Sequence, residues 1–369
     1  MDTSNGTASG RDWRRLFRST GRPPQWMLAS HLAIGLCVGA VCGLWLAPER
    51  GAILAGLAAG AVAAVGAAVP AALTVRASAA AVLVTVVAAS VAFATTTHPW
   101  WAAAAMAAAA MATSLAAGTG PVGAAVGTIG TLVYVLVATL GVVDDLVPSV
   151  SLGSGVARIA IGAVAGLAVS AVSATVRKRH GTADTANTTA APRTTALGPG
   201  MLRSLRSFDE YARDGVRRAV PLAIGTYLFE RSASRDALWV FLAAFVVLLP
   251  TGKTPYTVAL ARVASTVLGV VLLGLLSLVV PHQVLFTAAF VLLFLGITYT
   301  KTYPVPAGAL TAMGAILLAG TPTGAIGHWA GHRLLDTVIG CALALAATYL
   351  LWPHDKPDDD LQPVPATST

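Results

Sequence analysis

The segment VVLLPTGKTPYTVALARVAS, residues 246–265, contains Gly252, Lys253 and Thr254, which match the last three residues of a phosphate-binding loop. Such a loop needs another glycine five positions earlier, and position 247 is a valine. The residues before it form a long apolar run rather than a strand that leads into a glycine-rich turn. The segment therefore predicts no nucleotide site. We interpret it as a short loop between two helices, with a proline on each side of Lys253.

Three charged residues lie inside or beside apolar runs, where charge is rare. Arg262 lies one turn or more into the run after this loop, and Arg333 and Asp336 lie in the last run. A spacing of three places Arg333 and Asp336 on one helix face, where they can pair. Charged side chains within a membrane are costly and are often functional. The structural alternatives are that Arg262 extends to the membrane surface and that the Arg333–Asp336 pair fixes the last helix.

Other residue types that carry chemistry show no site-like spacing. The three cysteines, Cys37, Cys42 and Cys341, have neither CxxC nor metal-ligand spacing. The histidines lie mostly near predicted loops and form no ligand motif. Acidic clusters at 144–145 and 358–360 have no histidine or serine partner at catalytic spacing. We therefore expect no metal, no cofactor and no enzymatic activity.

The composition places these residues in a membrane protein. Of the 369 residues, 56% are hydrophobic and only 11% are charged, whereas soluble domains carry about 25% charged residues. A spanning helix needs about 20 apolar residues. The sequence predicts an all-α polytopic membrane protein of about twelve spans, at residues 27–46, 51–70, 74–96, 99–117, 121–143, 155–176, 216–230, 236–251, 257–280, 283–300, 304–320 and 333–352.

The spans divide the chain into two six-helix membrane halves, at 27–176 and 216–353. A cytoplasmic segment, 1–26, precedes them, and a polar tail, 354–369, follows. Residues 177–215 form a linker rich in Thr, Ala, Pro and Gly that ends in a helical pattern from Gly200. We interpret this pattern as an amphipathic helix on the membrane surface, where its arginines favour anionic lipid. The alternative is a helix that binds a partner.

The basic residues predict the orientation. With twelve spans and the N-terminus inside, 19 Lys and Arg residues face the cytoplasm and 5 lie outside or at outer helix ends, which is a strong positive-inside bias. The net charge of +8 therefore orients the chain in a membrane and does not indicate nucleic-acid binding. We expect a multi-pass protein of the cell membrane with both termini cytoplasmic.

The two halves show signs of a weak tandem repeat. GPVGAAVGTIG at 120 resembles VPAGALTAMGA at 305, and Arg76 and Arg158 correspond to Arg262 and Arg333 at offsets of 186 and 175. Parallel repeats recur in transporters, with the substrate path near the repeat interface. The alternative is two unrelated apolar halves.

The second half resembles the fusaric acid resistance-like, or aromatic acid exporter-like, family of integral membrane transporters; the first half is a degenerate repeat. The resemblance runs through VRRAVPLAIGTYLF from 216, ALWVFLAAFVVLLPTGKTPYTVALARVASTVLGVVLLGLL from 237 and HRLLDTVIGCALALAATYLLWP from 332. The matching positions are Arg217 or Arg218, Trp239, residues 250–254, Arg262, Thr266, Gly269, Arg333, Asp336, Thr337, Gly340, Trp352 and Pro353.

The resemblance implies a secondary exporter of aromatic carboxylic anions, driven by an ion gradient. Arginine offers a bidentate fork to a carboxylate, so Arg262 at the inner side and Arg333 at the outer side become candidate clamps at the two ends of the path. Arg76 and Arg158 are their first-half counterparts, and Asp336 is a candidate proton carrier. Lys253 and Trp239 complete the expected path. The alternatives are a passive anion channel, similar to plant malate channels, and a membrane scaffold without transport; a homodimer stays open.

Overall fold

The chain was analysed as a computed structural model, which describes residues 17–46, 51–95, 98–142, 152–179, 197–232, 237–248, 255–319 and 326–351. These residues are helical apart from turns, and no strand occurs among them. An all-α fold is therefore confirmed. Of the predicted site residues, Lys253 lies outside the described residues, as do the tail and much of the linker.

The first half contains a helix at each predicted span: α2 (Trp26–Leu46), α3 (Gly51–Ala68), α4 (Thr74–Thr95), α5 (Pro99–Ala117), α6 (Pro121–Val142) and α7 (Leu152–Arg179). Proline opens α5 and α6, where its fixed φ suits the first helical turn and its missing N–H has no helical partner to lose. Alanine, the strongest helix former, dominates α5. These local preferences explain why the helix starts agree with the sequence.

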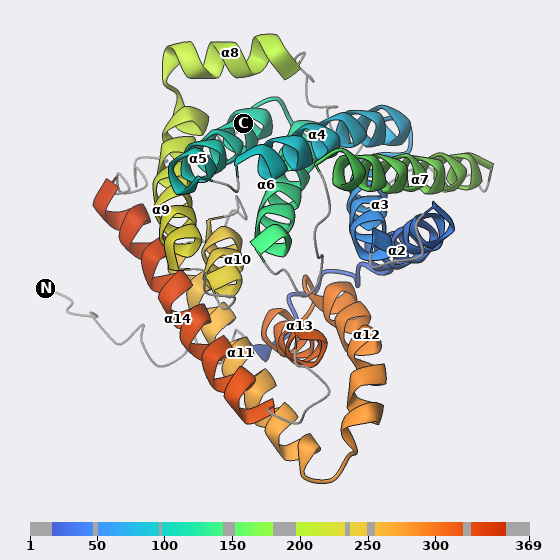
Figure 1. Cartoon of the computed structure of the whole chain (residues 1–369), viewed down its shortest axis with the longest axis vertical. Coiled ribbons are helices and arrows are strands. Elements are labelled where there is room, and N and C mark those ends of the chain that lie inside the picture. Colours follow the sequence, from blue (N-terminus) through green and yellow to red (C-terminus); the bar gives the residue numbers. More distant parts are fainter. Residues whose placement is uncertain are drawn as a thin grey trace, which may run out of the picture.

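The second half likewise contains α9 (Glu210–Ser232), α10 (Ala237–Val247), α11 (Pro255–Ser277), α12 (His282–Tyr299), α13 (Pro304–Ala319) and α14 (Ile326–Leu351). The predicted amphipathic helix is α8 (Leu197–Ser207). It does not continue into α9, because Phe208 has a φ of 47° and turns the chain. Figure 1 shows α8 lying across the end of α9.

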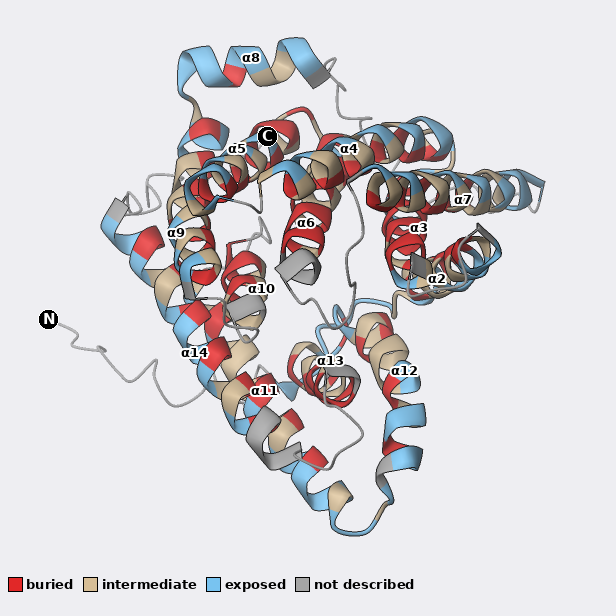
Figure 2. Cartoon of the chain, viewed as in Figure 1, coloured by how far each residue is buried: buried red, intermediate tan, exposed pale blue. Residues whose placement is uncertain are grey.

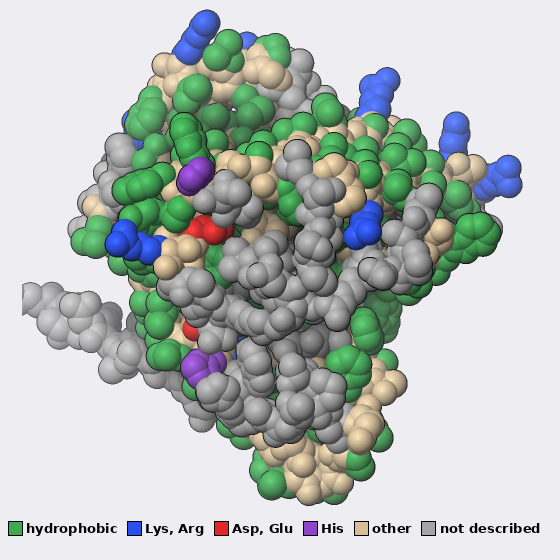
Figure 3. All heavy atoms as spheres, viewed as in Figure 1, with side chains coloured by type: hydrophobic (Ala, Val, Ile, Leu, Met, Phe, Trp, Pro, Cys, Tyr) green, Lys and Arg blue, Asp and Glu red, His purple; other side chains and the backbone are tan. Residues whose placement is uncertain are grey.

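Within the described residues, seven helices are long and apolar enough to cross a membrane: α2, α4, α5, α6, α7, α11 and α14. Three others, α3, α12 and α13, are apolar but contain shorter apolar stretches. Many large apolar side chains are exposed, including Leu278 at 81% and Val279 at 84%, just after α11. Figure 2 marks the exposed residues of the face in view, and Figure 3 shows many hydrophobic side chains on the same face. Such a surface needs lipid around it. The chain is a multi-pass helical membrane protein, and twelve spans stay a prediction.

Helix pairing follows the same order in both halves. In the first half α2 packs on α3 and α7, α3 on α4 and α7, α4 on α6 and α7, and α5 on α6. The second half repeats this order, since α9 packs on α10 and α14, α10 on α11 and α14, α11 on α13 and α14, and α12 on α13. The halves meet at the matching positions α5 against α9 and α2 against α12, and α6 also contacts α10.

The residues at the start of each half contact a turn of the other half. Before α2, the Thr20 N–H donates to the carbonyl of Thr302 over 2.8 Å, and the Thr302 hydroxyl donates to the Arg22 carbonyl over 2.9 Å. At the start of α9, the Tyr211 ring lies against Gly118, in the turn between α5 and α6. The turns at Thr302 and Gly118 occupy the same place in the two halves. Each half therefore contacts the other through the same pair of places, its own start and the other half's turn.

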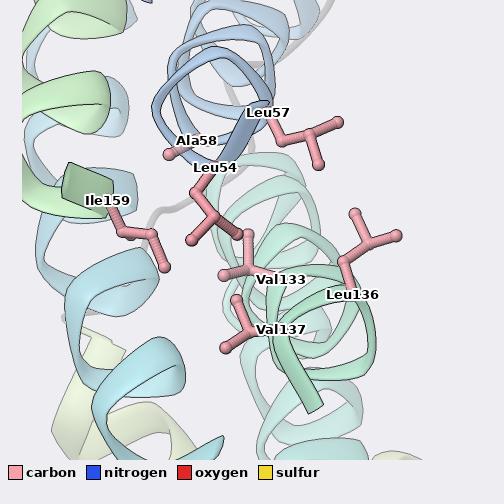
Figure 4. A pocket seen from close by; sticks show the side chains of 7 residues that line it. All are labelled: Leu54, Leu57, Ala58, Val133, Leu136, Val137 and Ile159. Atoms are coloured by element: carbon pink, nitrogen blue, oxygen red, sulfur yellow. The ribbon is translucent and has the colours of Figure 1, made fainter. Parts of the chain in front are cut away.

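The contact between α3, α6 and α7 in the first half is dry and closely packed. Figure 4 shows Leu54 of α3 pointing toward Val133 of α6, with Leu57 on the side of Leu136 and Ile159 of α7 on the other side. The space between them holds about 20 Å³, which is little more than one water, and an all-apolar lining gives a water no partner. A charged solute therefore has no path through this contact.

Candidate functional site

Three helices of the second half bring the predicted cationic residues together. Arg333 of α14 places its guanidinium carbon 3.3 Å from the ring centroid of Trp239 on α10. This is a close cation–π stack, which covers one face of the guanidinium with the indole. Both residues were predicted as part of the path, but their contact was not.

Arg262 and Arg333 lie near each other, close enough for their charges to repel. The Cys341 thiol is 3.9 Å from the Ala259 carbonyl, which fixes the level at which α11 meets α14. The two helices run side by side in opposite directions (Figure 1). Both arginines lie on the same side of that level. Measured along the helix axes at a rise of about 1.5 Å per residue, Arg262 is about 4.5 Å from it and Arg333 about 12 Å. The arginines are therefore about 7.5 Å apart along the helix axes.

The guanidinium groups are buried without full hydrogen bonding. Arg333 is 5% exposed, and its Nε and Nη1 have no hydrogen-bond partner. Arg262 is partly buried, and its Nε is shielded and has no partner either. Buried polar groups are nearly always hydrogen-bonded, and a shielded cationic donor without an acceptor is costly. Such donors can bind an anion that supplies the missing acceptors.

Asp336 adds one negative charge beside this pair. It is 7% exposed, lies three residues after Arg333 on α14 and attracts it electrostatically. Two arginines and one carboxylate leave the group one positive charge in excess. The predicted attraction between Arg333 and Asp336 is present, and the excess charge comes from Arg262. We call Trp239, Arg262, Arg333 and Asp336 the cationic cluster.

Small residues hold the helices of the cationic cluster close together. A Cβ on Gly340 would meet the backbone of Val240 and lie 2.8 Å from the Cβ of Ala243, so α14 lies directly against α10. On α11, a Cβ on Gly269 would lie 2.8 Å from the Ala309 carbonyl of α13. Small residues permit such close packing of membrane helices. Gly340 therefore sets the spacing at which Arg333 reaches Trp239, and Gly269 sets the spacing between α11 and α13.

The other predicted residues lie elsewhere. Arg76 is exposed at the start of α4, and Arg158 is partly buried on α7. No described interaction joins either of them to the cationic cluster. We expected Arg262 and Arg333 to form clamps at opposite sides of the membrane, whereas they form one group. The reason is that α14 begins at Ile326 rather than at the predicted 333, which places Arg333 about 10 Å inside the helix.

Two further arginines lie outside the cationic cluster: Arg218, which the sequence named only as an alternative to Arg217 in the family resemblance, and Arg177, which it did not single out. Arg218 of α9 is 3% exposed and forms an ion pair with Asp214, one turn earlier. Arg177 of α7 donates from Nη2 to the Thr74 hydroxyl over 2.5 Å and to the Gly66 carbonyl over 3.2 Å. The spacing of four between Asp214 and Arg218 was a detectable signal. Nothing in the sequence indicates the partners of Arg177, which belong to other helices.

The fold and the cationic cluster define a multi-pass helical membrane protein with a buried, positively charged group in its second half. Comparison with known families agrees with this class and makes it specific. Residues 222–347 match the family described as fusaric acid resistance protein-like, which confirms the predicted resemblance in the second half. The match covers about a third of the chain and contains the cationic cluster. Neither the curated proteins nor the solved structures gave a match.

Proposed function

We propose that this chain is a secondary exporter of organic anions, with aromatic carboxylates as its substrate class. The observation that carries the proposal is the pair of neighbouring arginines, Arg262 and Arg333, in which both Nε atoms and the Nη1 of Arg333 have no acceptor. Arg177 differs in that its Nη2 donates to two protein acceptors. The family match supports transport as the general activity, and efflux as its direction.

The chemistry of the cationic cluster suits an aromatic carboxylate. A carboxylate that leaves water needs charged donors to replace its hydration, and arginine supplies them in a planar fork. The indole of Trp239 stacks on Arg333 and offers an apolar aromatic neighbour for a ring attached to the carboxylate. Asp336 limits the excess charge to one, so a monoanion neutralises the group.

We further propose that the two halves are parallel repeats of six spans in the cell membrane, with both termini cytoplasmic. The repeated helix pairing and the reciprocal contacts between the halves support this arrangement. Substrate paths of repeat transporters lie near the repeat interface. Motion of one half relative to the other would then expose the cationic cluster to each side in turn.

Energy coupling separates the exporter from its alternatives. An exporter moves the anion uphill, and Asp336 is the acidic group in the cationic cluster that can exchange a proton. A passive channel with the same arginines only equilibrates the anion. A scaffold moves nothing, and its arginines tolerate replacement.

The test measures a radiolabelled aromatic carboxylate in inverted vesicles, with and without a proton gradient. Wild type is compared with Arg262→Ala and with Arg76→Ala, which removes an exposed arginine outside the cationic cluster. Uphill accumulation that needs the gradient and Arg262, but not Arg76, supports the proposal. Equilibrating flux alone indicates a channel. Absence of flux across a panel of anions contradicts transport.

A further inference from the structure

A large apolar slot lies in the first half, away from the cationic cluster. It encloses about 550 Å³ between α4, α5 and α6, and Met201 of α8 lines one end. The first-half contact shown in Figure 4 holds only about 20 Å³. The slot therefore exceeds ordinary packing defects by more than tenfold and falls within the range of ligand sites, about 300–1,000 Å³.

The slot exists because its walls combine small side chains with an exposed apolar stripe. The α5 wall is made largely of alanines, among them Ala108 and Ala112, which are exposed. The α4 wall carries Leu83, Val87 and Val91, spaced four apart and exposed by 67%, 53% and 38%. Alanine methyl groups cannot fill the distance between the helices, so apolar space remains. An apolar occupant would bury this stripe.

The length of the slot matches one leaflet of a bilayer. Its lining on α4 runs from Ala80 to Val91, which is about 16 Å along the helix. The hydrocarbon core of a membrane is about 30 Å thick, so one leaflet is about 15 Å. Met201 and Ala116 lie toward the end occupied by α8, and Tyr134 lines the slot farther along α6. The slot thus has the depth of one lipid chain.

The polar groups in the lining are already used within the protein. The Thr113 hydroxyl donates to the Gly127 carbonyl over 2.8 Å, and the Tyr134 hydroxyl donates to the Ala102 carbonyl over 2.9 Å. The Thr131 hydroxyl lies 3.0 Å from the Ala109 carbonyl and donates to it. No cationic residue lines the slot. A carboxylate would lose its hydration there without a partner, so the slot does not suit the anion of the cationic cluster.

The helix at the mouth carries the charge that a lipid headgroup needs. α8 exposes Leu202 and Leu205, at 48% and 47%, together with Arg203 and Arg206. A helix with this composition lies in the membrane interface with its apolar side chains among the lipid. Its arginines then lie at headgroup level, where basic residues attract anionic lipid.

We propose that the slot binds one acyl chain of an anionic phospholipid, whose phosphate lies beside Arg203 and Arg206. The occupant is a membrane component rather than the transported anion, so the inference does not depend on the transport activity. α8 leads directly into α9, which packs on α5 of the first half. The lipid therefore binds in the first half, beside the helix that leads into the second half.

The test reconstitutes the full chain in vesicles that contain phosphatidylglycerol with a photoactivatable diazirine in its acyl chain, diluted in phosphatidylcholine. Labelled peptides are mapped by mass spectrometry. The variant Ala108→Leu/Ala112→Phe fills the slot from positions that are already exposed, and Ala346→Phe enlarges an exposed alanine of α14 as a control. A second pair compares Arg203→Gln/Arg206→Gln with Lys178→Gln/Arg179→Gln, which removes two exposed charges at the end of α7.

We expect labelling of α4, α5 and α6 that falls at least fivefold in the filled variant and about as much in the α8 arginine variant, with both controls unchanged. Equal labelling by a phosphatidylcholine probe would overturn the choice of an anionic headgroup. Labelling that survives filling would overturn the slot as the site. Loss of labelling on addition of an aromatic carboxylate would show that the transported molecule occupies the slot instead.

Discussion

Replacing Arg262 by methionine should make the protein more stable and unable to bind its anion. Methionine keeps the apolar length of the arginine side chain and removes a charge whose Nε has no partner. Removing one of these two neighbouring like charges also relieves their mutual repulsion. Buried charges replaced by apolar side chains of similar volume often give about 1–4 kcal/mol of added stability. We expect a gain of about 1–3 kcal/mol.

The assay is thermal unfolding of the purified protein at one heating rate, since membrane proteins often unfold irreversibly. Extrapolated to a chain of this length, a gain of 1 kcal/mol raises Tm by about 1–2 °C, so Arg262→Met should raise Tm by about 1–6 °C. The same variant should bind an aromatic carboxylate at least about tenfold more weakly, because a charge-assisted hydrogen bond contributes about 1.5–3 kcal/mol.

Arg177→Met is the comparison variant, because that arginine is partly buried and donates to protein acceptors. It loses hydrogen bonds to Thr74 and Gly66, so its Tm should fall while anion binding persists. If Arg262→Met also lowers Tm and leaves binding intact, Arg262 is a structural residue and the reasoning from its unsatisfied nitrogen is refuted.

Three further predictions follow from single contacts. Trp239→Leu removes the stack on Arg333 and should weaken carboxylate binding by about 2- to 30-fold; an unchanged Kd in a binding titration would contradict a role for the indole. Gly340→Ala drives α14 away from α10 and should destabilise the protein by about 1–3 kcal/mol, whereas Gly331→Ala, which meets nothing within 4 Å, should leave Tm within experimental error. Thr302→Val removes one hydrogen bond to the segment before α2 and should speed hydrogen exchange there while lowering stability by about 0.5–1.5 kcal/mol; unchanged exchange would show that this contact is not maintained in solution.

The helices could be predicted because each depends on local sequence. Apolar length, the prolines at 99, 121, 255 and 304 and the polar turns set most starts within a few residues. The exceptions were α9, which begins at Glu210 rather than at 216, and α14, whose first turns contain Gly327, His328 and Gly331. In α14 these residues read as loop, yet the helix includes them. That boundary places Arg333 inside the helix rather than at its start.

The cationic cluster could be predicted in its members but not in its geometry. Buried charge is rare enough that Arg262, Arg333 and Asp336 stand out from composition alone. Their mutual distance depends on how α11 meets α14, which is set by the level at which Cys341 reaches Ala259. No local pattern encodes the level at which two helices cross. For the same reason, the sequence did not predict the stack of Arg333 on Trp239 or the hydrogen-bond partners of Arg177.

The two halves differ at the position of Arg262, and this difference bears on how a protein of two repeats uses a single anion site. Arg262 is the eighth residue of α11, and the eighth residue of α4 is Ala81, which is fully buried. Arg76 is only the third residue of α4 and is exposed. The sequence comparison matched Arg76 to Arg262, but the two arginines occupy different positions in their helices. The first half thus has the helix pairing of the second without an arginine at the position of Arg262. We infer that the second half recognises the anion, while the first half supplies the surface against which it can move.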